Sequence, residues 1–229
     1  MDALMAAVGS SGLAASKAFL DLCEPDLPPV VTELAQQGHP AAVVVPLLFT
    51  YAFHARVDVP EAVDAATEPG LPLVLADILG TGDDVLDVLV RHTAAAAVDE
   101  GASVLLFAVG SSSEAANAAV HDLAARWSSR RSGIVRAGFG TAEPRAVGVL
   151  DGLPGPVVVV PLFVSPGLLL DALAVTATER GIRVLPPLGT ALAPVVRERY
   201  QAALAAAALG EPASLDDAVI PPHGHRPIA

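Results

Sequence analysis

The chain has 229 residues, of which 53% are hydrophobic and 17% are charged, so it can bury a large core and is not a disordered protein. Its formal net charge of −12 argues against nucleic acid as the main partner. The single cysteine, Cys23, excludes an internal disulfide framework and a cysteine-rich zinc site. The longest apolar runs, residues 41–49 and 156–164, span about half of a membrane helix. The N-terminus lacks a signal-peptide pattern, so we expect a cytoplasmic protein without a membrane partner.

The charge is unevenly distributed along the chain. Residues 1–99 contain 3 basic and 14 acidic residues, whereas residues 100–229 contain 10 basic and 11 acidic residues. Nine of the 13 basic residues lie between Arg126 and Arg199, and all nine are arginine. An acidic first half is typical of a solubilising surface. The alternative is that the two halves bind different groups: the first half attracts cations, and the second half accommodates anionic groups.

Helical and strand-like segments alternate from one end of the chain to the other. Predicted strands have continuous Val and Leu runs, which indicate a parallel sheet covered by helices on both faces. Ser111 and Glu114 have the spacing of a helix capping box. The expected elements in chain order are a short helix over 1–8, a strand over 15–22, a helix over 27–37, a strand over 41–49, helices over 59–66 and 83–100, a strand over 102–109, helices over 113–128 and 142–152, a strand over 157–160, and helices over 167–180 and 191–209.

An internal repeat divides the chain into two halves. The sequence Val-Val-Val-Pro-Leu at 43–47 recurs at 158–162, Leu-Gly-Thr at 79–81 recurs at 188–190, and Glu-Pro at 24–25 recurs at 143–144. The order is the same in both copies, which predicts two α/β modules related by duplication. We expect a first module over 1–100, a second over 101–209, and a loosely ordered tail over 210–229. The first module is too short for the strand that opens the second one, so we expect it to have one strand fewer.

Two side chains follow predicted strands of the first half. His54 comes soon after the strand that contains Pro46, and Glu24 comes after the strand predicted over 15–22. Ligands of open α/β sheets bind beyond the carboxyl ends of the strands, and imidazole and carboxylate can bind a divalent metal or accept a proton. The alternatives are a structural histidine and an acidic residue that favours the N-terminus of the next helix.

A polar turn, Gly110, Ser111, Ser112 and Ser113, connects a predicted strand to a predicted helix. Backbone N–H groups at such a junction can bind a carboxylate or a phosphate. No Gly-Lys-Ser/Thr sequence follows, so the turn is not a Walker loop. The alternative is that the serines simply cap the helix.

Several of these motifs together resemble the class II chelatases of the CbiX/SirB type, the sirohydrochlorin cobaltochelatases and ferrochelatases. The resemblance covers most of residues 13–209. The motifs that carry it are Leu-Asp-Leu-Cys-Glu-Pro at 20–25, Val-Val-Pro-Leu-Leu-Phe followed by Phe-His-Ala-Arg-Val-Asp-Val-Pro at 44–60, Val-Val-Pro-Leu-Phe-Val-Ser-Pro-Gly-Leu-Leu at 159–169, and Pro-Pro-Leu-Gly-Thr at 186–190.

The resemblance implies two flavodoxin-like halves that face a cleft. It implies insertion of Co²⁺ or Fe²⁺ into sirohydrochlorin, with no organic cofactor and with the metal as a substrate. His54 matches the second of the family's two active-site histidines, and Glu24 matches its glutamate. A neutral His54 is needed for metal ligation, so activity should fall in acid. We expect the arginines of the second module to bind the carboxylates of the tetrapyrrole, with Arg56 beside His54 as the contributor from the first module. The turn from Gly110 to Ser113 would add backbone donors.

The family's first histidine, in a His-Gly-Ser/Thr sequence, has no match in this chain. The alternative function is therefore a non-catalytic paralogue that binds tetrapyrrole or metal. An intact upstream sequence with that motif would favour the enzyme, and a true start at Met1 would favour the paralogue. A missing strand would also leave a sheet edge open, which a second copy could protect in a homodimer.

Overall fold

The computed structural model describes residues 1–10, 12–20, 23–66 and 71–209. The predicted tail over 210–229 lies outside the described residues. Helices and strands alternate as the sequence predicts. They are α1 (Asp2–Gly9), α2 (Leu27–Gln36), β1 (Ala42–Val44), the π-helix η1 (His54–Asp58), α3 (Val59–Ala65), β2 (Leu73–Leu75), α4 (Asp83–Ala95), β3 (Ser103–Ala108), α5 (Glu114–Ser128), β4 (Val135–Phe139), α6 (Ala146–Asp151), β5 (Val157–Pro161), α7 (Leu168–Glu179), β6 (Arg183–Val184), the 3₁₀-helix η2 (Gly189–Leu192) and α8 (Ala193–Leu209).

The second half contains a four-stranded sheet in the order β4-β3-β5-β6, with every pair parallel. All six residues of β3, an inner strand of this sheet, are buried. Successive side chains of a strand point to opposite faces, so both faces of β3 are covered. Val104 and Leu106 pack into a core with α4 and α5, whereas Leu105 and Phe107 pack into a second core with α6 and α7. The continuous apolar pattern of β3 therefore reflects two cores, as the sequence predicts for a covered parallel strand.

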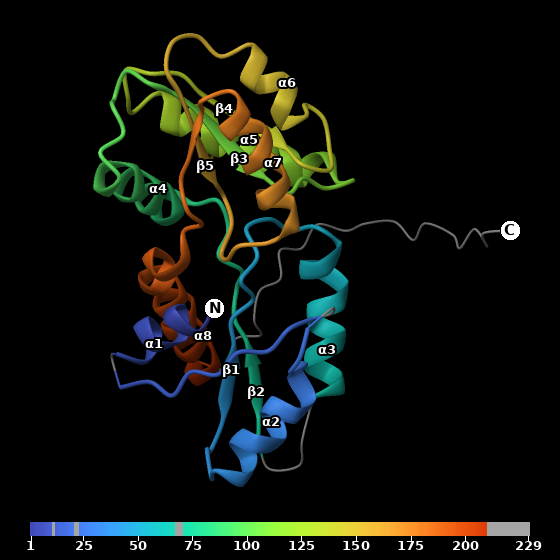
Figure 1. Ribbon diagram of the computed structural model, residues 1–229. Helices are drawn as coiled ribbons and strands as arrows, with labels where there is room; N and C mark the ends of the chain where they lie inside the picture. The colour runs from blue at the N-terminus through green and yellow to red at the C-terminus, as the bar shows by residue number, and fades with distance from the viewer. Residues whose placement is uncertain (11, 21–22, 67–70, 210–229) are drawn as a thin grey trace, which may run out of the picture.

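The first half contains a smaller sheet, in which β1 and β2 pair in parallel. The strand predicted over 41–49 is confirmed only in part, because β1 covers Ala42–Val44. In Figure 1 the two strands lie between α8 and α1 on one side and α2 and α3 on the other. Among the described residues, no helix combines the length and apolar character that crossing a membrane requires.

The helix that ends each half packs against the other half. Helix α8 follows the second sheet but packs against α1, β1 and β2 of the first half, while α4 packs against α5 of the second half (Figure 1). One apolar core consequently includes Leu4 from α1, Leu86 from α4, Trp127 from α5 and Val195 from α8. Because each of these two helices packs against the other half, the two halves share one apolar core. The division at residues 100 and 101 stays a prediction.

The strand predicted over residues 15–22 is wrong for its described part, since residues 15–20 form no strand. In the second half, the corresponding strand β4 pairs with β3, and the first half has no described counterpart of β3. A strand is stable only beside a partner that satisfies its backbone groups. The described residues therefore give the first half two strands and the second half four, a difference of two where the sequence predicts one.

Candidate functional site

His54 lies ten residues after the end of β1, where the chain enters a helix. It is the first residue of η1, which continues directly into α3. Its side chain is 59% exposed, and the ring of Phe53 meets it edge-on at 6.5 Å between centroids. Single turns of π-helix occur frequently at functional sites, where they change the direction of one side chain. His54 is therefore available to a ligand from solvent.

Asp58 holds the imidazole of His54 in place. Its Oδ2 atom lies 2.5 Å from His54 Nδ1, one helical turn further along the chain, and its side chain is 28% exposed. When the imidazole is neutral, Nδ1–H donates to this carboxylate and the lone pair of Nε2 is left for a metal ion or a proton. Histidine ligands of metals commonly have such a carboxylate partner. The i, i+4 spacing could have revealed Asp58, but sequence reasoning missed it.

A second carboxylate lies just beyond the neighbouring strand. Asp77 follows β2 by two residues and accepts hydrogen bonds from the hydroxyl of Tyr51 and from the backbone N–H of Ile78. Because β1 and β2 are parallel, their carboxyl ends lie on the same sheet edge. Tyr51 thus links the segment that leads to His54 to the end of β2. Sequence reasoning missed Asp77, although its position after a Val-Leu strand was the available signal.

Glu24 is exposed and follows residues 15–20, for which the sequence predicts a strand that the structure does not contain. A hydrogen bond from Phe19 N–H to Pro25 O, 2.8 Å long, closes the loop around it. Nothing in the described contacts joins Glu24 to His54, so their shared role stays a prediction. The described residues contain no cluster of three or more histidine, cysteine, aspartate or glutamate side chains with metal-binding geometry.

Most arginines of the second half already have partners within the protein. Arg126 and Arg130 pair with Asp83 of α4, and Arg180 pairs with Asp151. Arg197 and Arg199 donate to backbone carbonyls of the first half. These contacts hold helices together and occupy guanidinium groups that a polycarboxylate would need. Arg56, in the helical turn that follows His54, is half-buried, and its role toward a carboxylate stays a prediction.

The turn after β3 has a rigid conformation with internal hydrogen bonds. Gly110 has φ +92°, and a Cβ there would lie 2.9 Å from the Cβ of Phe139, so glycine is required. Ser111 N–H donates to Asn117 Oδ1 at 2.9 Å, and Ser113 N–H donates to Ser111 Oγ at 3.1 Å. Two of the backbone donors expected for a ligand are thus occupied.

The capping prediction for this turn needs a correction. The N-cap is Ser113, whose Oγ accepts from Ala116 N–H at 3.3 Å, and not Ser111. Helix α5 begins one residue after Ser113, and Ser111 lies too early to reach its free N–H groups. Binding of a carboxylate by Gly110, Ser112 and the serine hydroxyls stays a prediction.

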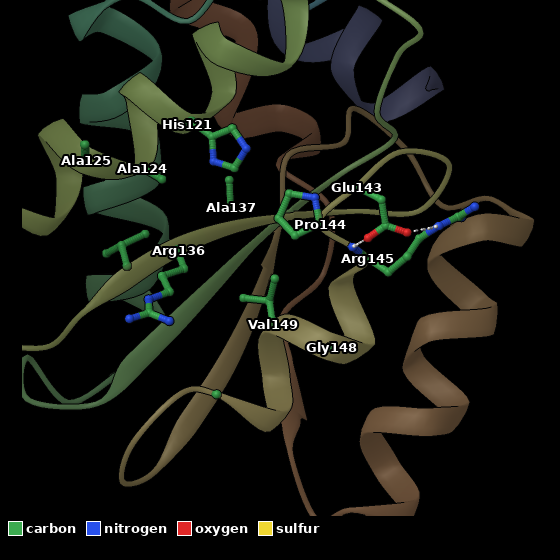
Figure 2. Close-up of a pocket in the computed structure, with 12 residues that line it drawn as sticks. His121, Ala124, Ala125, Arg136, Ala137, Glu143, Pro144, Arg145, Gly148 and Val149 are labelled. Carbon is green, nitrogen blue, oxygen red and sulfur yellow. Dashed lines mark hydrogen bonds and ion pairs between the residues drawn. The ribbon is translucent and has the colours of Figure 1, made fainter. Parts of the chain in front are cut away.

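The Glu-Pro motif of the second half borders a cavity of about 460 Å³ beside β4. Figure 2 shows the side chains that line it. Glu143 lies at one end of this cavity and forms an ion pair with Arg145 at 3.6 Å. Its backbone surroundings resemble those of Glu24, because Phe139 N–H donates to Pro144 O at 3.0 Å. The repeat seen in the sequence therefore extends to the local backbone structure.

Comparisons with known proteins agree with this architecture. SirB from Bacillus subtilis with Fe³⁺ superposes with a TM-score of 0.74 at 19% identity, covering 93% of this chain and 91% of that one. The sirohydrochlorin chelatase SirB from B. subtilis subspecies spizizenii in complex with cobalt superposes with a TM-score of 0.70 at 19% identity, covering 90% and 89%. At these identities the likeness establishes the fold: repeated α/β modules with parallel sheets.

Sequence comparisons identify the family. Sirohydrochlorin ferrochelatase of Priestia megaterium is 30% identical over 110 residues, which are 46% of this chain and 41% of that protein. The match thus spans about two fifths of this curated relative. The CbiX family model matches residues 3–96 and 103–203, one stretch in each half. The chain therefore belongs to the CbiX family.

Proposed function

We propose that this protein is a sirohydrochlorin chelatase, which inserts a divalent metal ion, Co²⁺ or Fe²⁺, into the tetrapyrrole. Family membership and the name of the Priestia megaterium relative support the substrate class. The observation that carries the proposal within this chain is the pair of His54 and Asp58, with 2.5 Å between Nδ1 and Oδ2. When Nδ1–H donates to Asp58, Nε2 of this exposed imidazole remains available to a ligand.

The chemistry requires a base and a metal ligand near the macrocycle. Insertion of one divalent ion displaces two pyrrole N–H protons, so two protons leave for every ion that is bound. Nε2 of His54 can hold the incoming ion or accept one of these protons. The carboxylate of Asp58 orients the ring and stabilises the imidazolium when a proton arrives. Glu24 is proposed as the second acceptor, and Arg56 with Gly110 and Ser112 as contacts for substrate carboxylates. No organic cofactor has a role in this scheme.

A non-catalytic tetrapyrrole-binding protein is the second candidate. It is favoured by one observation: within the described ranges, no third metal-binding side chain joins His54 and Asp58. Such a protein would retain the fold and bind the macrocycle without exchanging its protons for metal.

Absorption spectroscopy distinguishes the two functions. Purified chain is mixed with sirohydrochlorin alone and then with Co²⁺ or Fe²⁺ under anaerobic conditions. A chelatase gives metallated product at a rate proportional to protein concentration and above the protein-free rate. A binding protein shifts the spectrum of the macrocycle stoichiometrically and leaves the insertion rate at the protein-free value. Absence of both effects would contradict both functions.

A further inference from the structure

The two halves differ in one central strand. In the second sheet β3 lies between β4 and β5. The segment that corresponds to β4 in the first half is residues 13–19, because Phe19 N–H binds Pro25 O as Phe139 N–H of β4 binds Pro144 O. The counterpart of β5 is β1, with the shared Val-Val-Val-Pro-Leu sequence. No described strand lies between residues 13–19 and β1.

A cavity occupies this position. Its volume is about 650 Å³, and two of its walls are residues 13–20 and residues 41–48. Helices α1, α2, α3 and α8 contribute apolar side chains, among them Tyr200 and Leu204 of α8. The cavity thus follows the length of β1, and Leu73 and Val74 of β2 also border it. We call it the strand slot.

Part of the backbone of β1 points away from β2 and toward the strand slot. Ala42 N–H donates to Pro72 O at 3.0 Å and Val44 O accepts from Ala76 N–H at 2.9 Å, so both groups face β2. Alternate residues of a parallel strand point to opposite neighbours, which directs the N–H and C=O groups of Val43 and Val45 into the slot.

The second half shows what these groups bind when the strand is present. Leu162 N–H, just after β5, donates to Phe107 O of β3 at 2.8 Å. Its counterpart Leu47 N–H has no hydrogen-bond partner among the described residues. Val159 and Val160 of β5 are 0% exposed, whereas all three residues of β1 are only half-buried. The missing neighbour accounts for both differences.

The charge of the lining restricts the occupant. Among the described side chains that line the slot, only Lys17 and His39 are basic and none is acidic. The ammonium of Lys17 already pairs with Asp2, so a charged segment in the slot would lose its solvation without compensation. This mostly apolar lining is complementary to an uncharged apolar segment that extends the β1–β2 sheet beside β1.

We propose that the strand slot binds one extended apolar peptide strand, about five or six residues long, parallel to β1 and with the chemistry of β3. Such a strand would pair with Val43, Val45 and Leu47 by β-augmentation. It would restore in the first half the strand order of the second. Its carboxyl end would emerge at the sheet edge from which the chain continues to His54. The proposal does not depend on chelatase activity.

The probe is a synthetic peptide with the sequence of residues 103–110, flanked by lysines for solubility. Amide hydrogen exchange is measured on the full chain with and without the peptide, together with the thermal unfolding midpoint. We expect saturable one-to-one binding that slows exchange at Val43, Val45 and Leu47 at least tenfold and raises the midpoint. A peptide with proline in place of Leu105 should have no effect, since residues 103, 105 and 107 of β3 face the β5 side and proline at 105 removes the central donor to β1.

Two variants at exposed positions of α8 form a matched pair of test and control. Leu204→Glu places a charge in the slot lining and should abolish peptide binding, whereas Leu209→Glu, on the same helix but outside the lining, should bind like the parent. Equal binding by both variants, or no protection by the peptide, would overturn the proposal. Amides that are already protected without peptide would also overturn it: concentration-dependent protection would mean that a second copy fills the slot, and protection lost on removing residues 210–229 would mean that the chain fills it itself.

Discussion

Arg199 of α8 and Asp84 of α4 form an ion pair between the two exchanged helices, with 2.6 Å between Nη2 and Oδ2. The side chains are only 17% and 23% exposed. Arg199 also donates to the carbonyls of Ile78 and Leu79, both at 2.7 Å. Arg199 thus holds the Leu-Gly-Thr segment of the first half in place, although it lies more than a hundred positions later in the sequence.

Replacement of Arg199 should destabilise the whole protein. Arg199→Met removes three hydrogen bonds and leaves Asp84 without its cation, which we expect to lower the free energy of unfolding by about 2 to 3 kcal/mol. Denaturant unfolding measures this difference. Arg183→Met is the matched control, because Arg183 is exposed and forms no ion pair among the described residues. Equal losses in both variants would contradict a specific role for Arg199.

Two glycines of the second half should respond oppositely to alanine. Gly110→Ala places a Cβ 2.9 Å from Phe139 at φ +92°, and we expect a loss of about 1 to 3 kcal/mol. Gly148 lies inside α6, where an added Cβ would meet no atom within 4 Å, so Gly148→Ala should stabilise the protein by up to about 1 kcal/mol. Thermal unfolding of both variants tests the pair. A neutral Gly110→Ala would refute the structure of this turn.

The contact between α1 and residues 13–19 should weaken in acid. A hydrogen bond from Lys17, and then its charge, lowers the pKa of Asp2 below the ordinary value of 3.8. A lowered carboxyl pKa contributes stability above the unfolded value and loses it as the pH falls through the folded value. Because Asp2 is exposed, the effect should be small. We expect Lys17→Met to speed amide exchange in α1 at pH 6 and to have a smaller effect at a pH well below 3.8. An effect of the same size at both pH values would contradict it.

Asp58 should affect activity far more than stability. Asp58→Asn keeps the side-chain shape but removes the charge that orients His54, and we expect metal insertion to slow about 10- to 100-fold. Unfolding should be nearly unchanged, because the pair is partly exposed. Glu61→Gln, on the exposed surface of α3, is the control and should retain the parental rate. A fully active Asp58→Asn protein would exclude a positioning role.

The sequence predicts much of this fold because the repeat and the covered strands leave local signals. The Val-rich segments, the Leu-Gly-Thr turns and most helix boundaries follow from apolar patterns within each segment. Residues 15–20 have the composition of a strand but no neighbour with which to pair, and composition alone does not show a missing neighbour. The exchange of α4 and α8 is likewise invisible, because an apolar helix face does not specify which half it covers.

The candidate site is only partly predictable. His54 is evident from its place after a covered strand, and Asp58 could have been found from helical spacing. Ser111 and Ser113 have the residue types of an anion-binding turn, yet Asn117 and Ser111 occupy their N–H groups. A sequence shows which donors exist, and only the three-dimensional structure shows which of them are already bonded.

The central claim is that His54 performs metal insertion, and the rate of sirohydrochlorin metallation by the His54→Ala protein tests it most directly. We expect His54→Ala to lose about 10²- to 10⁴-fold in rate while its unfolding midpoint stays within a few degrees of the parent. His39→Ala should metallate at nearly the parental rate, because His39 precedes β1 whereas His54 follows it. A His54→Ala protein as fast as the parent would contradict the account.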